Sequence, residues 1–131
     1  MHNFCTLFDS NYLSRGLAMY RSLERTGGAF HLYIFAFDDR CAAILRALTL
    51  KHATIIPLKE FEDAQLLSVK PTRSRAEYCW TSTSSTILYV LEHYSVDRCT
   101  YLDADMLFFA DPDVLFREMA DRSVLITEHR Y

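Results

Sequence analysis

The sequence contains no apolar stretch of about 18 residues, so we expect no transmembrane helix. Its first residues, MHNFCTLFDSNY, place no basic segment before a long apolar one, which argues against a secretory signal. A basic excess is also missing, because 14 Lys and Arg against 17 Asp and Glu give a formal net charge of −3. Nucleic-acid-binding proteins usually carry a basic patch, so this composition argues against such a partner.

The sequence also lacks the cysteine spacing of a zinc site. Its cysteines, Cys5, Cys41, Cys79 and Cys99, lie far apart and form no CxxC pair. Small buried thiols in a reducing compartment explain them better than a metal site does. We therefore expect a cytoplasmic protein with reduced cysteines.

What the sequence does contain is enough apolar material for one folded domain. Half of the 131 residues are hydrophobic and 14% are aromatic, which argues against disorder. No repeat, low-complexity tract or linker divides residues 1–131, so we treat them as a single domain.

Strand and helix patterns alternate along the chain, which predicts an α/β domain with a mainly parallel sheet. The expected strands cover residues 2–8, 30–37, 53–58, 98–102 and 123–131. The expected helices cover residues 13–25, 40–52, 81–94 and 112–122, with a short helix within 60–69 and a loop at 70–75. Asp38 or Asp39 is expected to cap the second helix, and Asp111 and Asp113 to cap the last one and pair with its dipole.

Two aspartates, Asp103 and Asp105, follow the apolar fourth strand in the segment YLDADMLFFADPDVLF. Alternate residues of a strand share a face, so both carboxylates are expected to project together while Ala104 points away. Ligands of parallel α/β sheets bind beyond the carboxyl ends of the strands. Neighbouring carboxylates repel each other, and Mg²⁺ or Mn²⁺ would remove that conflict. A solvated loop that happens to contain acids is the alternative for so short a motif.

The segment TYLDADMLFFADPDVLF resembles the DxD segment of nucleotide-sugar glycosyltransferases with the GT-A fold. The stretch CTLFDSNYLSRGLAMYRSL resembles the opening of family eight-like members. The stretch RSRAEYCWTSTSSTILYVLEHYSVDRCTYLDAD resembles a bacterial group of glycosyltransferases. The resemblance covers essentially the whole chain. It implies a three-layer Rossmann-like GT-A fold and the transfer of a sugar from a nucleotide-diphosphate sugar, expected to be a UDP-sugar, to an unknown acceptor with Mn²⁺ or Mg²⁺.

The resemblance also implies roles for individual residues. Asp105 would bind the metal, Asp103 would bind the metal, the ribose or both, and Ala104 would lie against the ribose. Asp9 and Asn11 would reach uracil or ribose. The nucleotide-binding set implied in this way is Thr6, Leu7, Phe8, Asp9, Asn11, Tyr12, Asp103 and Ala104.

Several of the implied roles have a structural alternative. Tyr12 either stacks on the base or forms a contact at the entry to the first helix. Arg73 and Arg75 either meet the diphosphate or the sugar, or belong to a solvated loop. The family match suggests the site for Glu77, Tyr78 and Trp80, whereas aromatic packing in the core is the interpretation that composition favours.

Proteins of this family usually continue beyond the fifth strand, where later residues supply acceptor contacts and a further metal ligand. We therefore expect a truncated piece of a longer enzyme, with a short stand-alone protein of impaired chemistry as the alternative. A lone half would leave apolar sheet surface uncovered, so self-association as a homo-oligomer is expected.

Two other functions compete with sugar transfer. Haloacid dehalogenase-type phosphatases also place DxD after a strand and use the first aspartate as nucleophile. They typically carry the motif near the start, with Thr or Val two residues after the second acid, whereas Leu107 stands there in this chain. The other alternative is a nucleotide-sugar-binding module without turnover.

Overall fold

The centre of the computed structural model, which describes residues 1–128, is a four-stranded parallel sheet. Its strands are β1 (His2–Phe8), β2 (Phe30–Ala36), β3 (Ala53–Pro57) and β4 (Thr100–Tyr101). They lie in the order β3-β2-β1-β4, and each pairs with its neighbour in parallel. Most residues of β1 and β2 are buried, as expected of strands covered on both faces.

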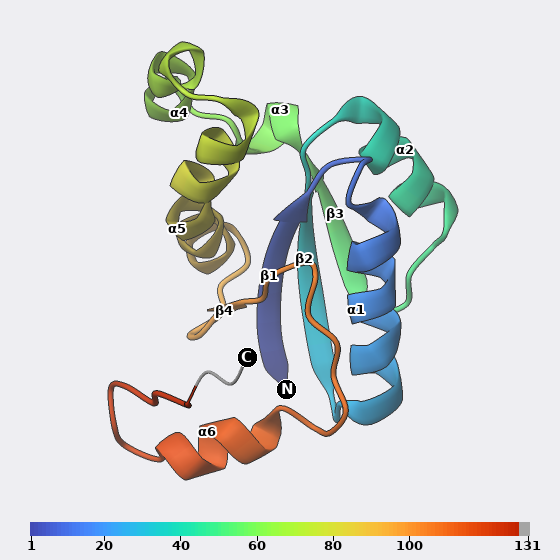
Figure 1. Ribbon diagram of the computed structural model, residues 1–131, viewed down its shortest axis with the longest axis vertical. Coiled ribbons are helices and arrows are strands. Elements are labelled where there is room, and N and C mark those ends of the chain that lie inside the picture. Colours follow the sequence, from blue (N-terminus) through green and yellow to red (C-terminus); the bar gives the residue numbers. More distant parts are fainter. Residues whose placement is uncertain (129–131) are drawn as a thin grey trace.

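Helices cover both faces of this sheet (Figure 1). α1 (Leu13–Thr26) and α2 (Asp39–Ala47) lie on one face, and α5 (Arg75–His93) lies on the other. Alternate side chains of β1 point to opposite faces of the sheet and so contribute to the core on both sides. Phe4 and Phe8 pack with α1 and α2, whereas Cys5 and Leu7 pack with α5. The predicted α/β class is therefore confirmed as a three-layer, Rossmann-like arrangement.

Short elements complete the described chain. α3 (Leu58–Phe61), α4 (Ala64–Val69) and a 3₁₀ turn, η1 (Lys70–Thr72), lead from β3 into α5. α6 (Asp113–Met119) follows the segment after β4. None of the helices over residues 1–128 combines the length and the hydropathy needed to cross a lipid bilayer.

The start of α5 differs from the prediction. The helix begins at Arg75, six residues before the expected start at 81, so the predicted loop ends one residue earlier. Ser74 accepts a hydrogen bond from the Glu77 amide, and the Glu77 carboxylate accepts one from the Ser74 amide. This reciprocal capping box fixes the helix start, and the hydroxyl residues from 81 onwards lie inside the helix.

Two other elements differ from expectation at the end of the chain. Residues 123–128 form no regular structure, although an apolar strand was predicted over 123–131. Residues 129–131 lie outside the described part. An apolar run becomes a strand only where another strand offers its backbone edge, and Val124 and Ile126 remain exposed instead.

The last helix is capped nearly as predicted but begins one residue late. α6 starts at Asp113, and its N-cap position is Pro112. The Asp111 carboxylate accepts the Asp113 amide at 2.9 Å, which satisfies one of the free N–H groups of the helix start. Asp113 in turn pairs with Arg117 at 2.8 Å and with His2 of β1 at 3.0 Å, so it ties α6 to the sheet.

Candidate functional site

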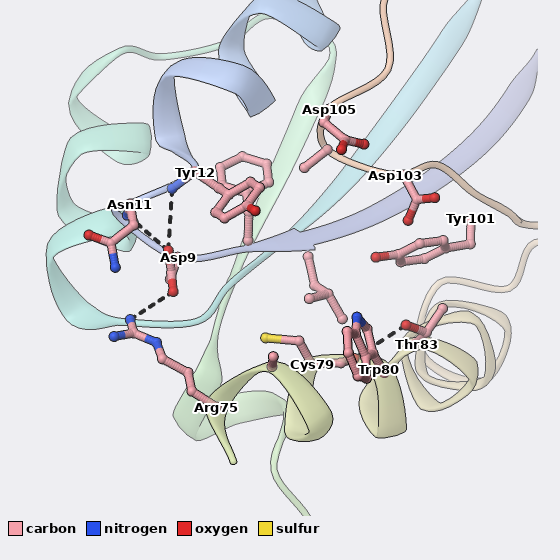
Figure 2. A pocket seen from close by; sticks show the side chains of 14 residues that line it. Asp9, Asn11, Tyr12, Arg75, Cys79, Trp80, Thr83, Tyr101, Asp103 and Asp105 are labelled. Carbon is pink, nitrogen blue, oxygen red and sulfur yellow. Dashed lines mark hydrogen bonds and ion pairs between the residues drawn. The ribbon is translucent and has the colours of Figure 1, made fainter. Parts of the chain in front are cut away.

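β1 and β4 are neighbours in the sheet, but the chain connects them to helices on opposite faces. The position between the carboxyl ends of β1 and β4 is therefore the topological switch point of the sheet. Parallel α/β sheets bind ligands at such a point. An open cleft of about 590 Å³ lies at this point. Its walls are the β1–α1 loop with the end of β1 (residues 7–12), the N-terminal half of α5 (75–83) and the segment from the end of β4 (101–105) (Figure 2).

Most of the residues predicted from the sequence meet in this cleft. Its lining includes Leu7, Phe8, Asp9, Asn11, Tyr12, Arg75, Asp103, Ala104 and Asp105. Thr6 does not reach it, because its side chain is fully buried in the sheet, where its hydroxyl has no partner among the described residues. Arg73 is also elsewhere and lines a smaller neighbouring cleft of about 310 Å³, because the chain turns into α5 only after it.

Asp103 and Asp105 lie in a turn rather than in the strand itself. β4 ends at Tyr101, and the Met106 amide donates a hydrogen bond to the Asp103 carbonyl at 3.2 Å. Both side chains are exposed and line the cleft. The buried Ala104 lines the cleft as well, instead of pointing away as strand alternation predicted. Within residues 1–128 neither carboxylate has a hydrogen bond or an ion pair, so both keep their oxygens free.

Two free carboxylates are a donor set that fits a hard divalent cation. Mg²⁺ in particular is often held by one or two carboxylates, with water and substrate phosphates filling the other positions. The described residues contain no group of three His, Cys, Asp or Glu side chains that could hold a metal ion. Asp103 and Asp105 would thus supply only part of a coordination sphere, and ligand oxygens would have to complete it.

Asp9 shapes the β1–α1 loop. One of its carboxylate oxygens accepts the amides of Asn11 at 2.8 Å and Tyr12 at 3.3 Å. The other oxygen pairs with the Arg75 guanidinium at 2.8 Å (Figure 2). Its oxygens are therefore engaged in holding the loop against α5, although the residue still lines the cleft.

Asp38, the N-cap residue of α2, also holds the β1–α1 loop. It caps α2 by accepting the Cys41 amide at 2.6 Å, as the sequence predicted for one of two aspartates. It also accepts the amide and the hydroxyl of Ser10, both at 2.8 Å. Burial raises the pKa of Asp38, but these hydrogen bonds and the charge of Arg75 outweigh it and leave that pKa below its ordinary value.

α5 presents different faces to the core and to the cleft. Tyr78 is buried and donates its hydroxyl to Glu62 at 2.8 Å, so core packing was the right interpretation for it. Core packing was wrong for Trp80, whose side chain is 73% exposed and lines the cleft. The capping pattern Ser-x-x-Glu at 74–77 was the signal that could have placed this tryptophan on a helix face.

Tyr12 occupies the opposite wall, at the N-cap of α1. Its ring is 45% exposed, and the Arg15 guanidinium lies 4.7 Å from the ring centre. Tyr12 therefore contacts Arg15 at the entry to α1, and its partly exposed ring also lines the cleft.

No protein-family model matches the chain. The chain is 32% identical over 125 residues to the uncharacterized protein YfnF of Bacillus subtilis strain 168. The aligned segment covers 95% of this chain and 41% of YfnF. It is also 30% identical over 129 residues to the uncharacterized protein YfnD of the same organism. That alignment covers 98% of this chain and 42% of YfnD. The chain thus spans about two fifths of the length of these relatives.

The remaining polar groups of the cleft are hydrogen-bonding groups rather than charged nucleophiles. Burial raises the pKa of Tyr101 to about 12, although a hydrogen bond with Thr83 partly offsets it. Burial, followed by the charge of Asp9, raises the pKa of the Cys79 thiol. Both groups are therefore protonated near neutral pH.

Proposed function

We propose that this chain is the nucleotide-sugar-binding part of a metal-dependent glycosyltransferase that uses a UDP-sugar. The observation that carries the proposal is the pair of carboxylates of Asp103 and Asp105, which have no partner within residues 1–128 and lie beside the carboxyl end of β1 at the switch point of the sheet. Acids without partners in a ligand-sized cleft favour a cation that arrives with its own anionic ligand.

In this proposal Asp103 and Asp105 hold Mn²⁺ or Mg²⁺ together with the diphosphate oxygens. Such an ion, when bound, offsets the negative charge that develops on the departing nucleoside diphosphate. Asn11 and Tyr12 face the nucleoside from the β1–α1 loop, whose shape Asp9 and Asp38 maintain through their hydrogen bonds.

Sugar transfer of this kind depends on charge stabilisation and positioning rather than on a strong protein nucleophile. The cleft is consistent with that requirement, because the Tyr101 phenol and the Cys79 thiol are neutral and can only donate or accept hydrogen bonds. Arg75 adds a cation at the edge of the cleft, where its charge is shared with Asp9.

Isothermal titration of UDP with Mn²⁺ or with EDTA tests the proposal. We expect Mn²⁺ to strengthen UDP binding about tenfold or more, which corresponds to about 1.4 kcal/mol. Asp103→Asn and Asp105→Asn should each remove that dependence on metal. Asp97→Asn serves as the matched control, since Asp97 is an exposed acid that precedes β4 and does not line the cleft. UDP binding that ignores both the metal and the two cleft variants would refute the proposal.

Binding without turnover is the second candidate for residues 1–131. It is favoured by the incomplete donor set, which offers two carboxylates and no third ligand within the described residues. We expect the 131-residue chain to bind UDP with Mn²⁺ but to release no free sugar from UDP-glucose. Sugar release from UDP-glucose by this chain, lost in Asp105→Asn, would rule out the binding-only candidate.

A further inference from the structure

Trp80 is the sole tryptophan of the sequence, and its indole is 73% exposed. Single exposed apolar side chains are common on protein surfaces, but this one lines the cleft. Within residues 1–128 it has no hydrogen bond, stacked ring or cation partner. A large, unpartnered aromatic side chain at the edge of a ligand-sized cleft is a typical binding residue.

The position of Trp80 follows from the spacing of α5. Ala76, Cys79, Trp80 and Thr83 all line the cleft, and they recur at the spacing of one helix face. Tyr78, Ser82, Thr86 and Val90 form the buried face of the same helix. The helix therefore fixes Trp80 on the cleft side, with its backbone held by the capping box and by the packing of the buried face.

The two exposed rings of the cleft stand on different walls. Figure 2 shows Tyr12 on the β1–α1 loop and Trp80 on α5, while Asp103 and Asp105 stand on the segment after β4. A nucleotide sugar carries its diphosphate between a base and a sugar. If the diphosphate lies against the carboxylates, the two halves of the ligand extend in different directions, and each can meet one ring.

The chemistry of the two walls differs. Beside Tyr12, the Asn11 amide can both donate to and accept from the edge of a base. Beside Trp80 are the hydroxyls of Thr83 and Tyr101. The Thr83 hydroxyl donates to the Cys79 carbonyl at 3.2 Å, so it can accept a hydrogen bond from a sugar hydroxyl. One face of a pyranose ring is rich in C–H bonds, and it packs well on the negatively polarised face of an indole.

We infer that Trp80 is the platform for the sugar ring of the nucleotide sugar, whereas Tyr12 faces the base. This inference rests on the proposed function. It assigns to Trp80 a role in which the side chain contributes to the affinity for UDP-sugars but little to the affinity for UDP.

Titration of UDP, UDP-glucose, UDP-galactose and UDP-N-acetylglucosamine with Mn²⁺ tests this assignment. We expect Trp80→Ala to weaken the binding of at least one UDP-sugar about tenfold while changing UDP binding less than about twofold. Trp80→Phe should retain most of the affinity, because it keeps a flat ring. Tyr12→Ala should weaken UDP and the UDP-sugars by the same factor.

Leu88→Ala is the matched control, because Leu88 is 55% exposed on the same helix and does not line the cleft. Circular dichroism should show that each variant keeps the helical content and melting temperature of the parent chain. As a second readout, the emission of the sole tryptophan should shift to shorter wavelength with the UDP-sugars and much less with UDP.

Each outcome separates the assignment from the proposed function. If Trp80→Ala changes UDP and every UDP-sugar equally, or changes none, the sugar platform is wrong although the nucleotide site stands. If no probe binds to the parent chain in the presence of Mn²⁺, the proposed function fails and the assignment fails with it.

Discussion

Asp38 should stabilise the fold and the cleft at the same time. Its carboxylate caps α2 through the Cys41 amide and holds the β1–α1 loop through Ser10, and its side chain is only 26% exposed. Loss of an N-cap costs about 0.5–2 kcal/mol, and hydrogen bonds to a charged group contribute about 1.5–3 kcal/mol each. These contributions are not additive, so we expect Asp38→Ala to lower the free energy of unfolding by about 2–4 kcal/mol.

Asp38→Asn separates the two contributions. Asparagine caps helices about as well as aspartate, so the bond from Cys41 should survive. An amide NH₂ cannot accept from the Ser10 amide, so the bonds to Ser10 should weaken. We expect a loss of about 1–2 kcal/mol for this variant. Asp39→Asn is the control, because Asp39 is exposed in the first turn of the same helix and contributes only a dipole interaction of about 0.5 kcal/mol.

The pH dependence provides the sharper test. The folded-state pKa of Asp38 lies below its ordinary value, so the ionised side chain stabilises the folded protein above the unfolded pKa of about 3.9. This stabilisation is lost as the pH falls through the folded-state pKa. Urea unfolding followed by circular dichroism should therefore give a difference in the free energy of unfolding between the parent and Asp38→Asn that is constant from about pH 6 to 8. This difference should shrink in acid, where Asp38 takes up about one proton. An equal difference at all pH values, or an unchanged stability of Asp38→Ala, would refute this reasoning.

Two further predictions concern packing and thiol chemistry. A Cβ added at Gly16 of α1 would overlap the ring of Phe8, which lines the cleft. Gly16→Ala should therefore lower the free energy of unfolding by about 1–3 kcal/mol in urea and weaken UDP binding. An unchanged free energy of unfolding together with unchanged UDP binding would contradict this packing. In labelling with iodoacetamide at pH 8, Cys99 should react first, because a hydrogen bond with Cys5 lowers its pKa and it is only partly buried. Cys41 should stay unlabelled, because burial raises its pKa to about 12, and equal labelling of both thiols in a mass spectrum would show that this difference in environment is wrong.

The inner strands could be predicted from the sequence because their signal is local. β1 and β2 are apolar runs bounded by polar residues, and their observed ends lie within one residue of the predicted ones. β4 could not be placed as well, because it covers only Thr100 and Tyr101, which pair with Phe4 and Cys5 of β1. The length of such a short strand depends on where the segment after α5 lies relative to β1, and a local sequence pattern does not reveal that position.

The acidic half of the candidate site and Arg75 could also be predicted, but the rest of the α5 wall could not. Asp103 and Asp105 stand out because charge directly follows an apolar strand. Trp80 looked like a core residue because aromatic side chains are usually buried, and its exposure follows only once the helix start at Arg75 is known. The link from Asp38 to Ser10 joins residues 28 positions apart, and it results from the parallel pairing of β1 with β2.

The central claim is that Asp103 and Asp105 share a divalent cation with a nucleoside diphosphate. A crystal of this chain grown with UDP and Mn²⁺, and measured at the manganese absorption edge, tests it most directly. We expect one anomalous peak about 2.1 Å from an oxygen of each carboxylate and from a diphosphate oxygen, as for a small octahedral cation. UDP bound in the cleft without such a peak, or manganese bound away from both aspartates, would contradict the account.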